Sequence, residues 1–328
     1  MKKLVLLIIC LLSLAQAQIG QPVESLELAM DAYKPLKTVM GYFAGKDFRF
    51  ELEERGGVLY KVSGKGPLDE TNIPLASDLI GYATGYGESM AGPVKTFFEE
   101  RIAELAGQGA TPLGVEQYIL TVDVSGEEAP YTLDFSLELS EVDTALFPQG
   151  THTLGPDDAK HVIREFSDFQ CPYCARFVNT AYEGIKEELL ARGDVRFEFH
   201  HFPLISIHPN AFPAAEATEC VVAANTPEAF WLYHDSLFAR QQAWQGLSDA
   251  SSYFVRLAED IGLSSEGMES CLAERSMADV VQAAYDAGVE LGIRGTPTVY
   301  VDGFKVGDYT RLENYLTLLD ISEKFAQE

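Results

Sequence analysis

Residues 165–174 read Glu-Phe-Ser-Asp-Phe-Gln-Cys-Pro-Tyr-Cys. The apolar run over 162–166 predicts a short buried strand, and the pattern over 175–192 predicts a helix. Cys171 and Cys174 therefore stand where the strand passes into the helix. Their i, i+3 spacing puts both sulfur atoms on one face of the helix, close enough to form a disulfide.

The position of Cys171 favours nucleophilic chemistry. Unpaired backbone N–H groups at the start of a helix stabilise a thiolate, which is the attacking species in disulfide exchange. Pro172 fits the first helical turn because its missing N–H costs nothing there. We expect Cys171 to be an exposed nucleophile and Cys174 a more buried resolving thiol, with Tyr173 exposed where it could contact substrate.

A lone Cys-x-x-Cys motif has two other interpretations, half of a zinc site or an inert structural disulfide. Zinc sites usually repeat the motif or add a close pair of histidines, whereas Cys220 and Cys271 lie far along the chain. His200 and His201 are adjacent on a predicted strand and so point to opposite faces, and His208 falls in a predicted loop. We therefore expect no metal and no cofactor.

Two further features support a redox site. Pro297 stands in Gly-Thr-Pro-Thr before an apolar strand, where a cis-proline would leave the backbone of Thr296 free to pair with an extended peptide. An ordinary trans turn is the alternative. Glu165 lies inside the first apolar strand, where burial would raise its pKa and let it exchange protons with Cys174. An outward-facing side chain is the alternative, and Asp168 is expected to be a solvated or capping carboxylate.

The segment from 162 to 174 closely resembles the DsbA-like branch of the thioredoxin superfamily. Further matches to that branch are Phe-Pro-Leu at 202–204, His-Pro-Asn-Ala at 208–211 and Gly-Thr-Pro-Thr at 295–298. The resemblance covers residues 153–322, about half of the chain. It implies a thioredoxin fold interrupted by a helical domain, an exported location and thiol–disulfide oxidoreductase activity.

By position, the resemblance makes Cys171 the nucleophile, Cys174 the resolving cysteine, Pro297 the cis-proline and Glu165 the buried acid. The chain departs from the best-known DsbA in three ways. It has Pro-Tyr where that enzyme has Pro-His, Thr296 where that enzyme has Val, and a large added N-terminal domain. The direction of electron flow is therefore open.

Cys220 and Cys271 both fall in the predicted insertion. Some DsbA-like relatives carry a structural disulfide between these two helices, and the spacing here resembles theirs. Closing a loop of this length would stabilise the fold by about 4 kcal/mol. A second redox pair that relays electrons to the first is the alternative.

Residues 1–17 have the pattern of a secretory signal. Two lysines precede an apolar run over 4–12 that is too short to span a bilayer, and Ala-Gln-Ala at 15–17 is typical of a cleavage site. A buried N-terminal helix and a lipoprotein site at Cys10 are the alternatives. The exported chain keeps four of its five cysteines, an even number that suits disulfides in an oxidising compartment. We expect a periplasmic or extracellular protein.

The composition excludes several kinds of partner. The chain has 328 residues, of which 50 are acidic and 24 basic, and its net charge is −26. That charge argues against nucleic acid and against an anionic membrane surface, because both require clustered Lys and Arg. An apolar content of 47% excludes a largely disordered chain, and the length suggests two domains.

The predicted fold class is α/β, a thioredoxin fold with a helical insertion, preceded by a separate α+β domain. We expect a signal peptide at 1–17, the α+β domain at 18–145, a linker rich in Pro and Gly at 146–158, and the thioredoxin domain at 159–328 with its insertion at about 209–290. The α+β domain reads helix–hairpin–helix–hairpin, with helices near 25–40 and 94–105 and hairpins at 48–62 and 118–139. This order suggests a duplicated unit that serves in dimerisation or substrate docking.

The leading hypothesis is an exported thiol–disulfide oxidoreductase that forms disulfides in exported cysteine-containing proteins and is reset by a membrane redox partner. The first alternative is an isomerase or reductase that works from the reduced dithiol and dimerises through the N-terminal domain. A non-enzymatic binding or chaperone-like module with a structural Cys-x-x-Cys is the second.

Overall fold

The computed structural model describes residues 19–30, 42–44 and 47–327. They fall into two compact units, of which the second is Glu141–Ser322 and the first is the remainder. The predicted signal at 1–17 lies outside the described residues. The same holds for most of the helix predicted at 25–40, of which α1 (Val23–Ala29) covers the beginning.

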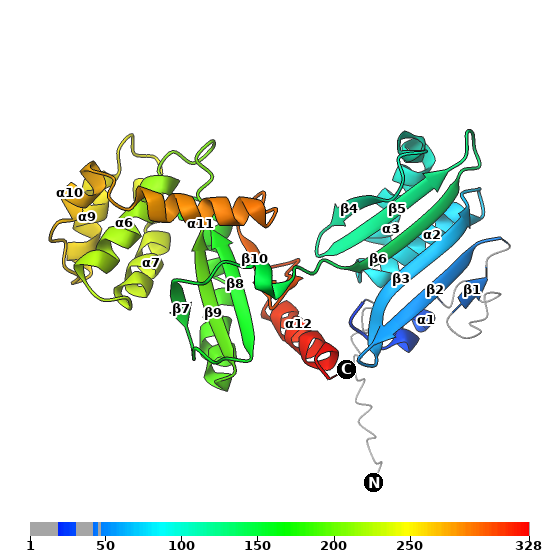
Figure 1. The fold of residues 1–328 in the computed structure, drawn as a ribbon, viewed down its shortest axis with the longest axis horizontal. Coiled ribbons are helices and arrows are strands. Elements are labelled where there is room, and N and C mark those ends of the chain that lie inside the picture. The colour runs from blue at the N-terminus through cyan, green and yellow to red at the C-terminus, as the bar shows by residue number, and fades with distance from the viewer. Residues whose placement is uncertain (1–18, 31–41, 45–46, 328) are drawn as a thin grey trace, which may run out of the picture. The chain divides into compact units, whose positions relative to one another are not determined.

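The first unit contains a six-stranded antiparallel sheet with the strand order β1-β2-β3-β6-β5-β4 (Figure 1). Its strands are β1 (Tyr42–Ala44), β2 (Arg49–Arg55), β3 (Val58–Pro67), β4 (Thr111–Val115), β5 (Tyr118–Ser125) and β6 (Thr132–Leu139). Two three-stranded meanders thus meet where β3 pairs with β6. Both predicted hairpins are present within these meanders. The edge strand β4 was not predicted, since Pro112 and Gly114 obscure its pattern.

Two helices, α2 (Asn72–Ala83) and α3 (Glu88–Glu100), lie side by side against one face of this sheet (Figure 1). A short 3-10 turn at Ile102–Leu105 follows them. The alternation in β6 that predicts one buried face is confirmed, because Leu133, Phe135, Leu137 and Leu139 are all buried. On the opposite face Lys65 pairs with Asp134 at 2.7 Å in the open, so that face is polar.

The second unit is built on a five-stranded sheet with the order β11-β10-β8-β9-β7. Its strands are β7 (His152–Leu154), β8 (His161–Ser167), β9 (Val195–His201), β10 (Thr298–Val301) and β11 (Phe304–Lys305). β8 runs parallel to β9 and antiparallel to β10, which is the arrangement expected of the thioredoxin fold. β7 lies within the segment predicted as a linker at 146–158, and it pairs with β9.

The single helix predicted at 175–192 is a series of shorter pieces. α4 (Pro172–Val178) ends at Asn179, and Thr180 leaves the helical region with φ −129° and ψ −100°. The chain continues through α5 (Ala181–Gly184), a π turn at Ile185–Leu189 and a 3-10 turn at Leu190–Arg192. The Cys-Pro-Tyr-Cys motif therefore starts a helix of only two turns.

The insertion between β9 and β10 is helical, as predicted. Its helices are α6 (Ala211–Ala224), α7 (Ala229–Ala239), α8 (Gln241–Trp244), α9 (Ser251–Asp260), α10 (Met268–Ala273) and α11 (Ala278–Glu290). The closing helix is α12 (Leu312–Phe325), and a short 3-10 turn at Thr144–Leu146 precedes β7. A buried cluster at the end of β8 that leads into α4 consists of Phe166, Phe202, Ile293 and Tyr300.

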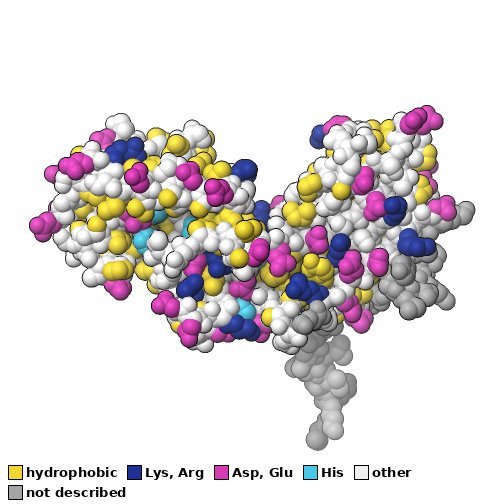
Figure 2. Space-filling view, in the orientation of Figure 1, with side chains coloured by type: hydrophobic (Ala, Val, Ile, Leu, Met, Phe, Trp, Pro, Cys, Tyr) yellow, Lys and Arg dark blue, Asp and Glu magenta, His cyan; other side chains and the backbone are white. Residues whose placement is uncertain are grey.

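Two surface properties bear on function. On the face seen in Figure 2, acidic side chains are scattered over both units, so the high net charge is not gathered at one site there. Within the described residues, no helix combines the length and the apolar character needed to cross a membrane.

Candidate active site

The end of β8 and the start of α4 place Cys171. Cys171 is the N-cap residue of α4, with an extended backbone at φ −69° and ψ 124°, and Pro172 occupies the first turn. The N–H of Cys171 donates to the carbonyl oxygen of Asp168 at 3.0 Å, and the carbonyl of Cys171 accepts the N–H of Ala175 at 3.2 Å. The residue is thus held by backbone hydrogen bonds on both sides.

Cys171 and Cys174 are free thiols with opposite acidities. The pKa of Cys171 falls to about 6, mainly because the Cys174 thiol hydrogen-bonds to its sulfur, helped by Thr296 and by the backbone N–H groups of Cys174 and Tyr173, while burial opposes the change. Burial and the neighbouring Cys171 raise the pKa of Cys174 well above its usual range. The pair therefore holds one thiolate near neutral pH, on Cys171.

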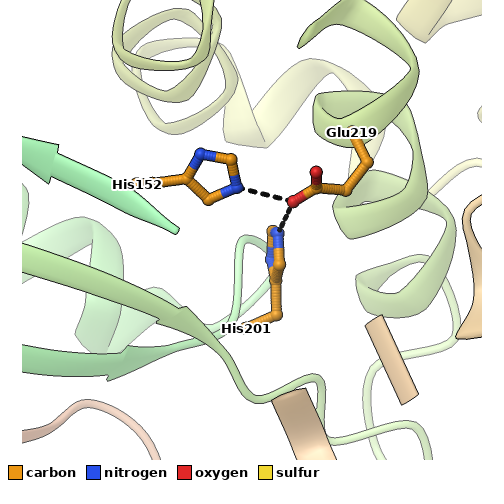
Figure 3. Close-up of side chains that lie close together, drawn as sticks. All are labelled: His152, His201 and Glu219. Carbon is orange, nitrogen blue, oxygen red and sulfur yellow. Dashed lines mark hydrogen bonds and ion pairs between the residues drawn. The ribbon is translucent and has the colours of Figure 1, made fainter. Parts of the chain in front are cut away.

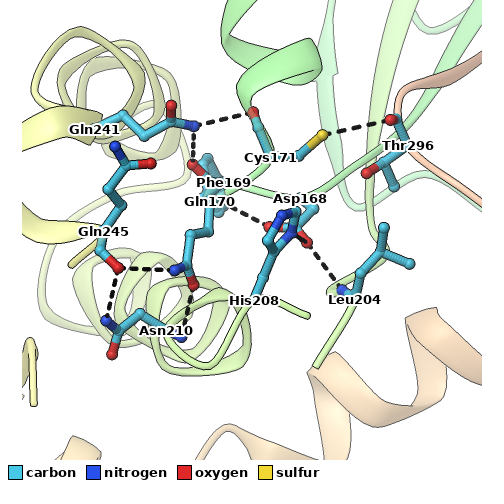
Figure 4. Close-up of polar contacts among 10 residues, drawn as sticks. All are labelled: Asp168, Phe169, Gln170, Cys171, Leu204, His208, Asn210, Gln241, Gln245 and Thr296. Carbon is cyan, nitrogen blue, oxygen red and sulfur yellow. Dashed lines mark hydrogen bonds and ion pairs between the residues drawn. The ribbon is translucent and has the colours of Figure 1, made fainter. Parts of the chain in front are cut away.

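The prediction that Cys171 is exposed is wrong. Its side chain is only 2% exposed, and Cys174 is 0% exposed. Thr296 lies against it, with its carbonyl oxygen 3.4 Å from the sulfur (Figure 4). Acidity rather than exposure distinguishes the two thiols.

Glu165 lies on β8 and is fully buried. Burial raises the pKa of its carboxyl group to about 8, although Ser167 opposes the change. Its charge also acts on Cys174, whose pKa it raises. The inward orientation is therefore the correct one of the two readings of this residue, and the carboxyl group can carry a proton at neutral pH.

Thr296, Pro172 and Tyr173 are the residues predicted to contact substrate, and of these Thr296 lies against the sulfur of Cys171. The Thr296–Pro297 peptide bond is cis, and Thr296 is half-buried beside the sulfur. Pro172 and Tyr173 are exposed, Tyr173 by 58%. The structure therefore brings together Cys171, Cys174, Glu165 and Pro297 with the proposed contact residues.

Asp168 is buried rather than solvated, which corrects half of its predicted role. It is 1% exposed because the loop after β9 covers it. Its Oδ1 accepts the N–H of Gln170 at 2.7 Å, which is the capping half of the prediction. Its Oδ2 accepts the N–H of Leu204 at 2.9 Å and the Nδ1–H of His208 at 2.7 Å (Figure 4).

Three buried carboxamides that the sequence did not single out connect the same loop to the insertion (Figure 4). Gln241 of α8 donates from Nε2 to the carbonyl oxygens of Phe169 at 2.8 Å and Cys171 at 3.0 Å. Gln170 accepts the N–H of Asn210 at 2.7 Å. Sequence patterns give little signal for such residues, since an amide side chain in a helix usually faces solvent.

Cys220 of α6 and Cys271 of α10 form a disulfide with a Cα–Cα distance of 6.1 Å. α6 and α10 pack against each other within the insertion. The bond closes the insertion on itself, 51 residues apart in sequence.

A cluster of three side chains that could bind a metal ion links β7, β9 and α6 (Figure 3). His152 and His201 both donate from Nε2 to the same oxygen of Glu219, at 2.6 and 2.8 Å. A metal-bound imidazole normally donates its second nitrogen to an acceptor, whereas Nδ1 of His201 is buried without a hydrogen-bond partner in the described part of the chain. The three side chains therefore form a hydrogen-bonded triad, and within the described residues His201 lacks the second acceptor that a metal-bound imidazole normally has. His200 instead lies 3.5 Å from Glu198.

The second unit is similar to known proteins. Residues 148–321, just over half of the chain, match the family model described as thioredoxin. Disulfide bond formation protein D of Bacillus subtilis is 27% identical over 161 residues, which are 47% of this chain and 68% of that protein. The Na(+)/H(+) antiporter NhaA 3 of Salinispora tropica is 35% identical over 156 residues, 48% of this chain. The match spans only 22% of the antiporter's length.

Solved structures are also similar to part of the chain. BdbD from Bacillus subtilis in its oxidised form has 25% identity and a TM-score of 0.48, covering 53% of this chain and 92% of that one. Wolbachia pipientis alpha-DsbA1 has 21% identity and a TM-score of 0.49, covering 57% and 99%.

Proposed function

The chain belongs to the thioredoxin family, and we propose that it is a DsbA-like thiol–disulfide oxidoreductase that acts on protein cysteines through Cys171 and Cys174. One observation carries the proposal. Two free thiols stand one helical turn apart, and the first has its pKa lowered to about 6 while the second has its pKa raised. Such a pair supplies both the nucleophile and the thiol that resolves the mixed disulfide.

The proposed direction is disulfide formation. In the oxidised protein, a thiolate of the client attacks the sulfur of Cys171, the Cys171–Cys174 bond breaks, and a mixed disulfide forms. The second thiol of the client then attacks the client sulfur of the mixed disulfide, which forms the disulfide of the client and releases Cys171 as a thiolate. The client loses two electrons and two protons to the motif. A thiolate stabilised near neutral pH favours the reduced motif and hence makes its disulfide a good electron acceptor.

Glu165 serves the proton transfers of this exchange. When Cys174 attacks the mixed disulfide in the reverse, resolving step, its thiol must lose a proton, and its raised pKa makes that loss difficult. A carboxyl group with a pKa of about 8, coupled to Cys174, can accept the proton at mildly alkaline pH and return it.

The proposal also includes export of the chain and reoxidation of its motif by a partner protein. The predicted signal at 1–17 and the Cys220–Cys271 disulfide both suit an oxidising compartment outside the cytoplasm. Cysteine-containing exported proteins are the proposed clients, and a membrane redox partner is proposed to reoxidise the motif. The first unit, with its polar outer sheet face, is assigned to client docking or to homodimer formation, which light scattering of the full chain distinguishes.

The test is equilibration of the chain without residues 1–17 in glutathione buffers, followed by quantification of the oxidised Cys171–Cys174 pair. A disulfide donor is expected to have a reduction potential near about −120 mV, whereas a reductant or isomerase lies closer to about −270 mV. The Cys174→Ala variant is expected to accumulate mixed disulfides with a client that contains a disulfide, because the Cys171 thiolate attacks that bond, one client thiol leaves, and no second thiol of the motif resolves the product. A potential at the lower value would assign the opposite direction, and a motif that never exchanges with thiols would refute the proposal.

A further inference from the structure

The loop after β9 is fastened along the loop that carries Cys171. The N–H of Phe202 donates to the carbonyl oxygen of Ser167 at 2.7 Å, and the N–H of Asn210 donates to the side chain of Gln170. Between these two points, the N–H of Leu204 reaches the Asp168 carboxylate. The segment 202–210 is therefore held in register with residues 167–171, so that its side chains have fixed positions relative to Cys171.

His208 is the ionisable side chain that this arrangement brings to the loop. Its backbone N–H donates to Leu204 at 2.9 Å and its carbonyl accepts the N–H of Ala211 at 3.1 Å, so the residue is fixed on both sides. Its Nδ1 donates to Oδ2 of Asp168 at 2.7 Å. Figure 4 shows the imidazole and the carboxylate facing each other in the loop that leads to Cys171.

The two members of this pair differ in their surroundings. The Asp168 carboxylate is already stabilised by two backbone N–H groups besides the imidazole, which disperse its negative charge. The imidazole remains 16% exposed and keeps its proton more readily than usual. The pKa of His208 is raised first by the hydrogen bond to Asp168 and then by the charges of Asp168 and Cys171, whereas burial lowers it.

The coupling between His208 and Cys171 acts in both directions. A thiolate that favours the protonated imidazole is itself favoured by that imidazole, to the same extent in free energy. Asp168 and Cys171 are the titratable groups that act on His208. The coupling is present while His208 is protonated and disappears as the pH rises through its pKa.

We propose that His208, oriented by Asp168, is a positioning residue whose positive charge stabilises the Cys171 thiolate and so strengthens the motif as an oxidant. The claim that the motif becomes a stronger oxidant rests on the proposed function. The claim that His208 stabilises the thiolate is independent of it, since that effect holds for either direction of electron flow.

The test compares variants that remove or keep the charge. His208→Gln keeps an N–H for Asp168 but loses the charge, whereas His208→Lys keeps the charge. Arg192→Gln is the matched control, because it removes a positive charge just before β9 begins, at the end of the sheet away from Cys171. In each reduced full-length chain, the alkylation rate of Cys171 is followed against pH by mass spectrometry, and the equilibrium with glutathione is measured.

His208→Gln is expected to move the alkylation profile to higher pH and to lower the equilibrium constant for oxidation of glutathione roughly fivefold. The Lys variant is expected to stay within about twofold of the natural chain, and the Arg192 control to be unchanged. An unchanged profile in folded His208→Gln, or an equal shift in the Lys variant or the control, overturns the proposal. His208→Asn takes the place of the Gln variant should that chain unfold.

These readouts separate the two proposals. A natural chain that alkylates with a low thiol pKa but never oxidises a client would refute the proposed function and leave the role of His208 intact. A chain that oxidises clients, and whose Cys171 pKa is the same in all variants, would support the proposed function and refute the role of His208.

Discussion

The two cysteine pairs of the second unit differ in their chemical state. Cys220 and Cys271 are joined across two helices of the insertion, while Cys171 and Cys174 remain thiols at the start of α4. Burial does not separate the pairs, because Cys171 and Cys220 are each 2% exposed. What differs is the surroundings of the sulfur: Cys171 has hydrogen-bond donors that favour a thiolate, and a carboxyl group lies beneath its partner.

The comparison shows that the polar neighbours of a buried cysteine decide its chemistry. A buried thiol without such neighbours has a raised pKa and is inert. The lowered pKa of Cys171 requires the Cys174 thiol, Thr296 and two backbone N–H groups to converge on one sulfur. The first pair is therefore interpreted as the reactive one and the second as a structural one.

Replacing Cys171 by Ser gives the largest expected effect. The substitution removes the sulfur that the client attacks, so the rate of client oxidation is expected to fall by roughly a thousandfold or more. The matched control is the Cys220→Ala/Cys271→Ala double variant, which is expected to stay within about twofold of the natural chain below its melting temperature. Oxidation of a reduced, unfolded client measures both. Equal losses in the two would remove the distinction between the pairs.

Opening the Cys220–Cys271 disulfide is expected to affect stability instead. On the chain-entropy estimate, the loop that it closes contributes about 4 kcal/mol to the free energy of unfolding. Urea denaturation of the Cys220→Ala/Cys271→Ala variant, followed by a probe in the second unit, measures the loss. A variant of unchanged stability that can no longer be reoxidised would instead identify the pair as an electron relay.

The fold of the second unit could be predicted because its signals are local. The apolar run before the motif and the strand at 195–201 lie within β8 and β9 as expected. The helix after the motif was predicted as continuous, since apolar periodicity does not register a single residue such as Thr180 that leaves the helical region. In the first unit, α2 was missed because Pro74 and Gly81 lower the helical signal, although tertiary packing buries most of the helix.

The candidate site was predictable to the extent that its residues lie near the motif in sequence. Cys171, Cys174 and Glu165 fall within ten residues of one another, so their relation follows from one strand and one helix. Asp168 was partly misjudged, because its burial depends on a loop that begins beyond β9. The role of Gln241 depends on the packing of α8 against that loop, which no local pattern encodes.

Replacing Glu165 by Gln tests whether the carboxyl group beside the reactive pair accepts the proton of Cys174. The deprotonated carboxylate is the form that accepts the proton of Cys174, and it gains population as the pH rises towards about 8. The natural chain is therefore expected to resolve mixed disulfides faster with rising pH, and the Gln variant to be roughly a hundredfold slower without that dependence. Stopped-flow release of a mixed disulfide measures the rate.

The exposed carboxyl group of Glu183 provides the matched control. Glu183→Gln removes a negative charge from the same unit without touching the buried site. It is expected to leave both the rate and its pH dependence unchanged. A Glu165→Gln chain with the natural pH profile would show that Cys174 loses its proton to solvent.

The smallest expected effect links the two regions, because the insertion that carries the second pair also holds the loop of the first. Gln241→Ala leaves the carbonyl oxygen of Phe169 without the amide that donates to it and takes one of two donors from Cys171. The free energy of unfolding is expected to fall by about 1–2 kcal/mol, with a roughly twofold change in Cys171 alkylation. Gln242→Ala, at the exposed next position, is the control and should change neither quantity. If both variants behave alike, the amide contacts of Gln241 neither hold the loop nor contribute to the acidity of Cys171.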